Sequence, residues 1–185
     1  FEWSHPPQIE KSGHAFFAGN MSEAYAEFDE EFWGMPSRLN SIQYLQEYGG
    51  EKYVSDRIDT QDYLEKLNSH NFFICLSGVH MPLCHSMYEA LYFQCIPLVH
   101  KKLLPFVDSE LAELLAPYAW ENNADLLVKL NDLVVYDLDQ INGTQLRLSE
   151  YWSTLLGPQS LRNSIDNADC ILLCAEENSV KLATQ

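Results

Sequence analysis

The stretch NFFICLSGVHMPLCHSMYEALYFQCIPLV, residues 71–99, decides the fold. It opens with an apolar run without alternation, residues 71–78, which is typical of a central parallel strand covered on both faces. A short loop, a helical pattern over residues 85–93 and a second strand-like run over 95–99 follow. A strand, a helix and a strand in this order predict a βαβ unit with parallel strands.

The same alternation continues on both sides of this stretch. An α/β fold is therefore predicted, Rossmann-like, with a mainly parallel sheet and helices on both faces. Residues 1–13 are expected to be a tag-like or linker segment, because WSHP resembles the start of an affinity tag, and residues 14–185 one domain. Further strands are predicted at 14–20, 52–58 and within 168–183, and helices at 35–50, 59–70 (capped by Asp59), 108–117, 122–133 and 137–156, the last interrupted near Asn142-Gly143.

The charge of the chain restricts its partners. With 27 acidic and 11 basic residues, the formal net charge is −16, which disfavours binding to nucleic acid and to anionic lipid. No apolar run approaches the roughly 20 residues that span a bilayer. The five cysteines are an odd number, typical of a reduced intracellular protein, so a cytoplasmic location is expected.

The loop after the first strand carries the candidate site. In open α/β sheets, ligands bind beyond the carboxyl ends of strands, beside helix N-termini. Here Ser77-Gly78 end a strand and a helix opens at Cys84-His85, whose free N–H groups suit phosphate. His85 and Glu89 are four residues apart and share one helix face. This layout fits a nucleotide-sugar, with ribose hydroxyls on the carboxylate and diphosphate on the histidine and backbone amides.

The same residues allow other interpretations. His80, Cys84 and His85 could bind zinc, but the spacing His-x3-Cys-His matches no closed tetrahedral pattern. A thiolate nucleophile at Cys84 paired with His85 is disfavoured, because sequence neighbours on a helix point in different directions. His85 and Glu89 could also be a solvated surface pair, and the lysines at 101–102 a solvated turn.

A family resemblance adds to this interpretation. The segment FFICLSGVHMPLCHSMYEALYFQCIPLV is similar to exostosin-like glycosyltransferases, and MYEALYFQCIPLV resembles the donor-binding element of the GT-B fold. FFAGN, SRLNSIQYL and CAEENSVKL follow the same order, so the likeness covers roughly residues 15–185. It implies the C-terminal, nucleotide-sugar-binding lobe of such an enzyme.

The resemblance also implies roles for individual residues. Glu89 would bind the donor ribose, Arg38 would reach the diphosphate, and the Gly19-Asn20 turn would border the cleft. Many retaining GT-B enzymes have a second glutamate eight positions earlier, where this chain has Met81, so the likeness does not extend to a mechanism that needs it. The expected donor-binding residues are Gly19, Asn20, Arg38, Ser77, Gly78, His85, Ser86 and Glu89, and no catalytic residue is assigned.

Partners and cofactors follow from the same likeness. The expected substrates are a nucleotide-diphosphate sugar and a carbohydrate or glycoconjugate acceptor, and the acceptor-binding lobe would lie upstream of Phe1. No metal is expected, because the helix dipole and basic side chains stabilise the leaving diphosphate. Two alternatives stay open: a sugar-nucleotide epimerase or dehydrogenase, disfavoured because no G-x-G-x-x-G follows a strand, and a non-enzymatic flavodoxin-like module.

Overall fold

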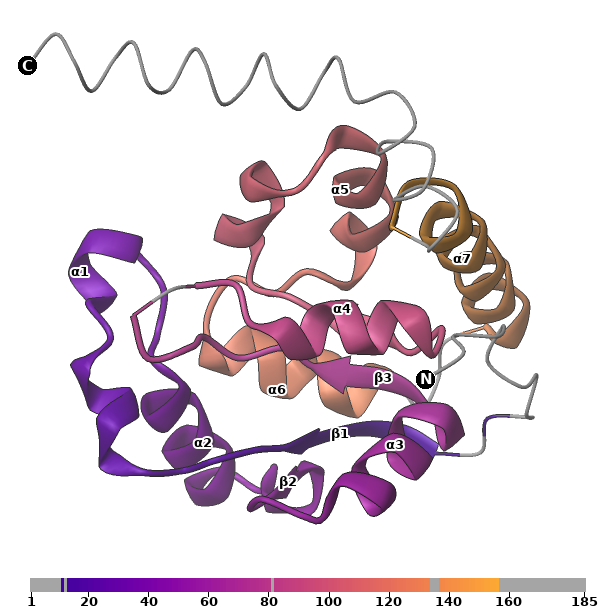
Figure 1. Ribbon diagram of the computed structural model, residues 1–185. Coiled ribbons are helices and arrows are strands. Elements are labelled where there is room, and N and C mark those ends of the chain that lie inside the picture. Colours follow the sequence, from indigo (N-terminus) through magenta and orange to yellow (C-terminus); the bar gives the residue numbers. More distant parts are fainter. Residues whose placement is uncertain (1–10, 12, 81, 134–136, 157–185) are drawn as a thin grey trace, which may run out of the picture. The chain divides into compact units, whose positions relative to one another are not determined.

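The structure is a computed structural model that describes residues 11, 13–80, 82–133 and 137–156 (Figure 1). Side chains are described up to residue 154. The chain divides into two compact units, one of which extends to Ser149 and contains the sheet. The other includes residues 150–156 of the described chain.

Four parallel strands form one sheet with the order β2-β1-β3-β4. Phe17 pairs with Val54 on one side of β1, and Ala15 pairs with Phe72 on the other. This order confirms the α/β, Rossmann-like prediction. The strands are β1 (Gly13–Ala18), β2 (Val54–Ser55), β3 (His70–Ile74) and β4 (Ile96–Leu98).

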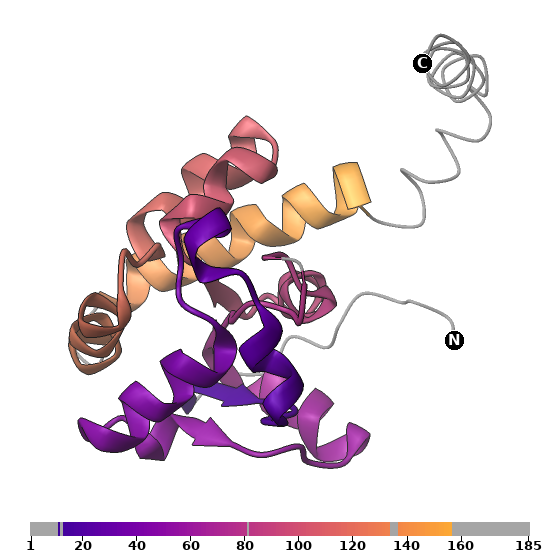
Figure 2. The same ribbon diagram turned by 90° about the vertical axis from the view of Figure 1, so that its left-hand side faces the viewer.

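Helices cover both faces of this sheet (Figure 2). α2 (Arg38–Glu47) and α6 (Asn123–Asp132) pack together on one face. α3 (Thr60–Ser69) and α4 (His85–Tyr92) lie on the other, where α3 contacts β1 and β3 and α4 contacts β4. The remaining elements are η1 (Glu23–Glu27), α1 (Glu30–Trp33), η2 (Glu51–Tyr53), η3 (Lys101–Phe106), α5 (Ser109–Leu115), η4 (Ala116–Tyr118), α7 (Leu138–Tyr151) and the π-helical turn Trp152–Leu156.

The helix starts follow the capping signals in the sequence. The side chain of Asp59 accepts a hydrogen bond from the backbone N of Asp62, as predicted. Asp108 caps α5 and Asn122 caps α6 in the same way. Each cap satisfies backbone N–H groups that the first turn of a helix leaves unpaired.

The central strands form the core. Phe72, Phe73 and Ile74 are at most 1% exposed, as expected for a parallel strand covered on both faces. Beyond β4, Trp120 forms a parallel bridge with His100, and its indole N–H donates to the carbonyl of Leu98. An isolated parallel bridge to Trp120 therefore follows the carboxyl end of β4.

The predicted elements differ from the structure in several places. β3 ends at Ile74 rather than at residue 78, and β2 has two residues rather than seven. The predicted interruption at Asn142-Gly143 is wrong, because α7 runs through both residues. A Cβ added at Gly143 would meet no atom within 4 Å, so this glycine marks no close approach. The strand predicted within 168–183 lies outside the described residues.

One further property of the helices concerns membranes. Across the described ranges, no helix has both the length and the apolar character needed to cross a bilayer.

Candidate functional site

A cleft of about 500 Å³ lies where the strand order reverses, at the carboxyl ends of β1 and β3. From β1 the chain crosses to β2 on one side and returns to β3 on the other, so the loops after β1 and β3 diverge. In Figure 1 the arrowheads of β1 and β3 both point toward the side where α4 begins. The volume falls within the range of small-molecule sites in proteins.

Arg38 supplies the positive charge of the cleft. It is the first residue of α2, whose cap Ser37 accepts a hydrogen bond from Asn40. The side chain is only 7% exposed, yet the guanidinium lines the cleft. Its Nε donates to the carbonyl of Ser77 at 3.0 Å and one terminal nitrogen donates to the carbonyl of Asn20 at 3.4 Å.

No carboxylate of the described residues is paired with Arg38, in a chain with 27 acidic residues. The guanidinium lies 3.9 Å from the ring centroid of Tyr25, which supplies only a cation–π contact. Two of its five N–H groups are used, so three remain for a ligand. Because buried charges are normally paired, this arrangement calls for an anion.

Glu89 and Tyr63 lie on another wall of the cleft. The Tyr63 hydroxyl donates to Oε2 of Glu89 at 2.9 Å. Burial and then the charge of Glu89 raise the pKa of Tyr63, so the phenol stays protonated and donates. This contact fixes the carboxylate and leaves Oε1 as an acceptor for a ligand hydroxyl.

The first turn of α4 completes the cleft. The N-cap Cys84 makes no side-chain capping hydrogen bond. His85 and Ser86 line the cleft in this turn, and Glu89 lines it one turn later, so the predicted sharing of a helix face is confirmed. Unpaired N–H groups and the positive end of the helix dipole attract phosphate.

Seven of the eight predicted donor-binding residues line this cleft. Ser77 does not: it is 1% exposed and contributes its backbone carbonyl as the acceptor for Arg38. Cys84, where the sequence predicts the helix to open, also lines the cleft as expected. The residues of the cleft that were not predicted are Phe17, Ala18, Tyr25, Arg57, Ile58, Thr60, Tyr63 and Leu83. Arg57, Ile58 and Thr60 follow the carboxyl end of β2. The rule that ligands bind beyond the carboxyl ends of strands, which predicted Gly78, could therefore have predicted these three residues as well.

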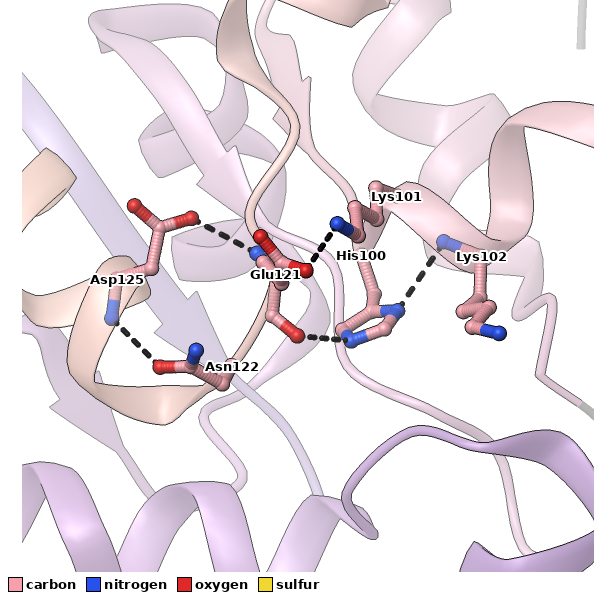
Figure 3. A network of polar contacts seen from close by, with 6 residues as sticks. All are labelled: His100, Lys101, Lys102, Glu121, Asn122 and Asp125. Carbon is pink, nitrogen blue, oxygen red and sulfur yellow. Dashed lines mark hydrogen bonds and ion pairs between the residues drawn. The ribbon is translucent and has the colours of Figure 1, made fainter.

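A second polar group lies beyond the carboxyl end of β4 (Figure 3). His100 is 1% exposed, its Nδ1 accepts from the backbone N of Lys102, and its Nε2 donates to the carbonyl of Glu121. Lys101 forms an ion pair with Glu121, and Asp125 accepts from the backbone N of Glu121. Both ring nitrogens of His100 and the ammonium of Lys101 therefore have protein partners in this group.

The arrangement of potential metal ligands bears on the zinc interpretation. No group of three or more His, Cys, Asp or Glu residues there is arranged to hold a metal ion. His85 and Cys84 instead line the cleft described above. Among the residues that line the cleft, Arg38 can bind an anion and Glu89 can accept from a hydroxyl group.

Comparisons of the chain with protein-family models, with curated proteins and with solved structures gave no match.

Proposed function

We propose that the chain is the donor-binding lobe of an exostosin-like GT-B glycosyltransferase, which binds a nucleotide-diphosphate sugar in this cleft. One observation carries the proposal: Arg38 is a buried cation with three unused N–H groups and no carboxylate partner among the described residues. A diphosphate supplies the missing negative charge and several acceptor oxygens, and charge-assisted hydrogen bonds to arginine are among the strongest in proteins. In a protein with a net charge of −16, the global field opposes binding of an anion, so the local cation decides the site.

The other end of the ligand is assigned to Glu89. One carboxylate oxygen is held by Tyr63, and the second is free to accept a ribose hydroxyl. Arg38 and Glu89 both line the cleft, so one nucleoside diphosphate would bridge them. Arg38 and Glu89 would thus bind opposite ends of one ligand, which explains why they do not pair with each other.

The proposed chemistry is transfer of the sugar to a carbohydrate or glycoconjugate acceptor. As the bond between sugar and diphosphate breaks, negative charge grows on the leaving diphosphate. Arg38 and the N-terminus of α4 would stabilise that charge, since preorganised donors aimed at developing charge lower the barrier. The catalytic base and the acceptor site are assigned to a separate lobe, and no residue of this chain is proposed as catalytic.

A thermal-shift screen tests this proposal. UDP and GDP are compared with uridine, guanosine and inorganic pyrophosphate. At a concentration of about 100 Kd, the matching diphosphate is expected to raise the melting temperature by about 5–10 °C. The free nucleoside should raise it less, because it cannot occupy the Arg38 end.

The screen also separates the alternatives. A shift with nicotinamide dinucleotides and with neither diphosphate would indicate a dehydrogenase or epimerase. No shift with any of these ligands at millimolar concentration would contradict the proposal and favour an interaction module.

A further inference from the structure

Two cysteine thiols meet at the edge of the cleft. Cys75 directly follows β3, and its backbone N still donates to the carbonyl of Leu98. Cys84 is the N-cap of α4. Their sulfur atoms are 3.5 Å apart, although eight residues separate them in the sequence. Both are free thiols in this structure.

The two thiols differ in access and in charge. Cys84 lines the cleft and is 9% exposed, whereas Cys75 is 0% exposed. The hydrogen bond from Cys75 lowers the pKa of Cys84 to about 6, and Ser86 and Arg38 add to this effect against the influence of burial. The same hydrogen bond, with burial, raises the pKa of Cys75. Reactive cysteines typically lie at helix N-termini beside a cation, which describes Cys84.

Cys95 provides an internal comparison. It is also a free thiol and 0% exposed, and it lies outside the cleft. Burial raises its pKa to about 12. No described cysteine contacts its sulfur. Cys95 is therefore expected to behave as an inert core residue, as buried structural cysteines do.

We propose that Cys84 and Cys75 are a redox-active dithiol, in which Cys84 is the peroxide-sensitive thiol and Cys75 the resolving thiol. The geometry that supports this is a contact between two sulfurs, of which Cys84 lines the cleft and Cys75 lies behind it in the core. The inference does not rest on nucleotide binding.

The oxidation balances with a hydroperoxide as the oxidant. The Cys84 thiolate attacks one peroxide oxygen, an S–O bond forms, the O–O bond breaks, and the leaving hydroxide takes up a proton to give water. The Cys75 sulfur then attacks the sulfenic sulfur, an S–S bond forms, and the second oxygen leaves as water with the proton of Cys75. The dithiol loses two electrons and two protons, and hydrogen peroxide is reduced to two molecules of water. A dithiol reductant reverses the change and is itself oxidised to a disulfide.

The disulfide would alter the start of α4. A disulfide holds its sulfurs at about 2.05 Å, so the thiols must approach by about 1.5 Å. Cys84 precedes His85 and Ser86 directly, so oxidation moves the first helical turn relative to β3.

The methionines of the chain allow a direct test. Cyanogen bromide cleaves after Met81 and Met87 and so separates the thiols: Cys75 falls in fragment 36–81, Cys84 in fragment 82–87, and Cys95 with the two remaining cysteines in fragment 88–185. After brief treatment with one equivalent of hydrogen peroxide, alkylation of free thiols and cleavage, mass spectrometry identifies linked fragments. We expect fragment 82–87 joined to 36–81, lost after dithiothreitol, and roughly 100-fold faster alkylation of Cys84 than of Cys95 in untreated protein.

Two variants assign the roles. In Cys75→Ser the sulfenic acid on Cys84 should persist and be trapped by dimedone, while Cys95→Ser, the matched control, should form the same linked fragment as the parent. Equal alkylation of Cys84 and Cys95, or no link between fragments 36–81 and 82–87, would overturn the proposal without bearing on nucleotide binding. Both of these readouts use the unmodified chain, so they hold whether or not a variant folds.

Discussion

Two polar groups lie beyond strands of the same sheet, and they differ in how far the protein satisfies them. Beyond β4, both nitrogens of His100 are hydrogen-bonded, and Lys101 is paired with Glu121. Beyond β1 and β3, Arg38 has no carboxylate partner among the described residues, and Glu89 is contacted by Tyr63 at one oxygen.

The difference separates a structural network from a binding site. A buried polar group with all its partners rigidifies the fold, and removing one partner leaves another unsatisfied. A buried cation without a partner is costly, and a ligand that supplies the missing charge recovers part of that cost. The region beyond β4 should therefore affect stability, and the cleft should affect binding.

Of the substitutions considered, Arg38→Met is expected to have the largest effect on diphosphate affinity. The substitution keeps the length and apolar stem of the side chain and removes the charge that would bind diphosphate. We expect affinity for the matching nucleoside diphosphate to fall by about 100-fold, or about 3 kcal/mol, in isothermal titration calorimetry. Lys101→Met, the matched control beyond β4, should leave affinity unchanged. Equal effects of the two substitutions would mean that binding depends on overall charge and not on this cleft.

Glu89→Gln tests the other end of the cleft. The amide keeps the size of the side chain but presents N–H donors where ribose hydroxyl protons need an acceptor. We expect a loss of about 1.5–3 kcal/mol, roughly 10- to 150-fold in affinity, with little change in unfolding free energy. Glu121→Gln is the control and should not alter affinity. Unchanged binding by Glu89→Gln together with a much lower melting temperature would make Glu89 a structural residue.

His100→Gln should lower the free energy of unfolding and leave diphosphate affinity unchanged. The longer amide can still donate toward the carbonyl of Glu121 but leaves the backbone N of Lys102 without its acceptor. A buried donor without a partner costs about 1–2 kcal/mol, which urea unfolding at neutral pH would measure. Diphosphate affinity of the folded variant should equal that of the parent, and a loss of affinity would place His100 in the binding site.

The smallest expected effect is the pH dependence of the change in unfolding free energy that His100→Gln causes. Burial lowers the pKa of His100 below 6.5, its ordinary value, and Lys101 and Lys102 add to this while Glu121 opposes it. As pH falls below 6.5, the unfolded state binds the proton first, so the stabilisation by neutral His100 is present above that pH and declines below it. The difference in unfolding free energy between parent and His100→Gln should thus be smaller at about pH 5.5 than at about pH 7.5. A difference that grows in acid would show that His100 is stabilised as a cation.

The sequence predicted the order of strands and helices because local signals determine them. The apolar run that contains β3 and the caps at Asp59, Asp108 and Asn122 are such signals. Asn142-Gly143 shows their limit, since these turn-forming residues lie inside a helix. Gln145 donates to the buried Asn71 and Thr144 contacts Tyr118, so tertiary contacts outweigh the low helix propensity.

The candidate site was predicted where it follows a strand or a helix start, as at Gly78, Arg38 and Glu89. Tyr25 was missed because its place over Arg38 depends on the fold of the segment between β1 and α2. Tyr63 was missed because its contact with Glu89 joins two helices 26 residues apart in the chain. Ser77 was assigned wrongly to the wall of the cleft, since the boundary between a buried strand end and an exposed loop is not visible in the sequence.

The most direct test of the central claim is a crystal structure of the chain with the nucleoside diphosphate selected by the thermal-shift screen. We predict a phosphate oxygen about 2.7–2.9 Å from a guanidinium nitrogen of Arg38, with a ribose hydroxyl on the free oxygen of Glu89. A ligand bound instead beside His100 and Lys101, or one that leaves the guanidinium of Arg38 without an anionic partner, would contradict the account.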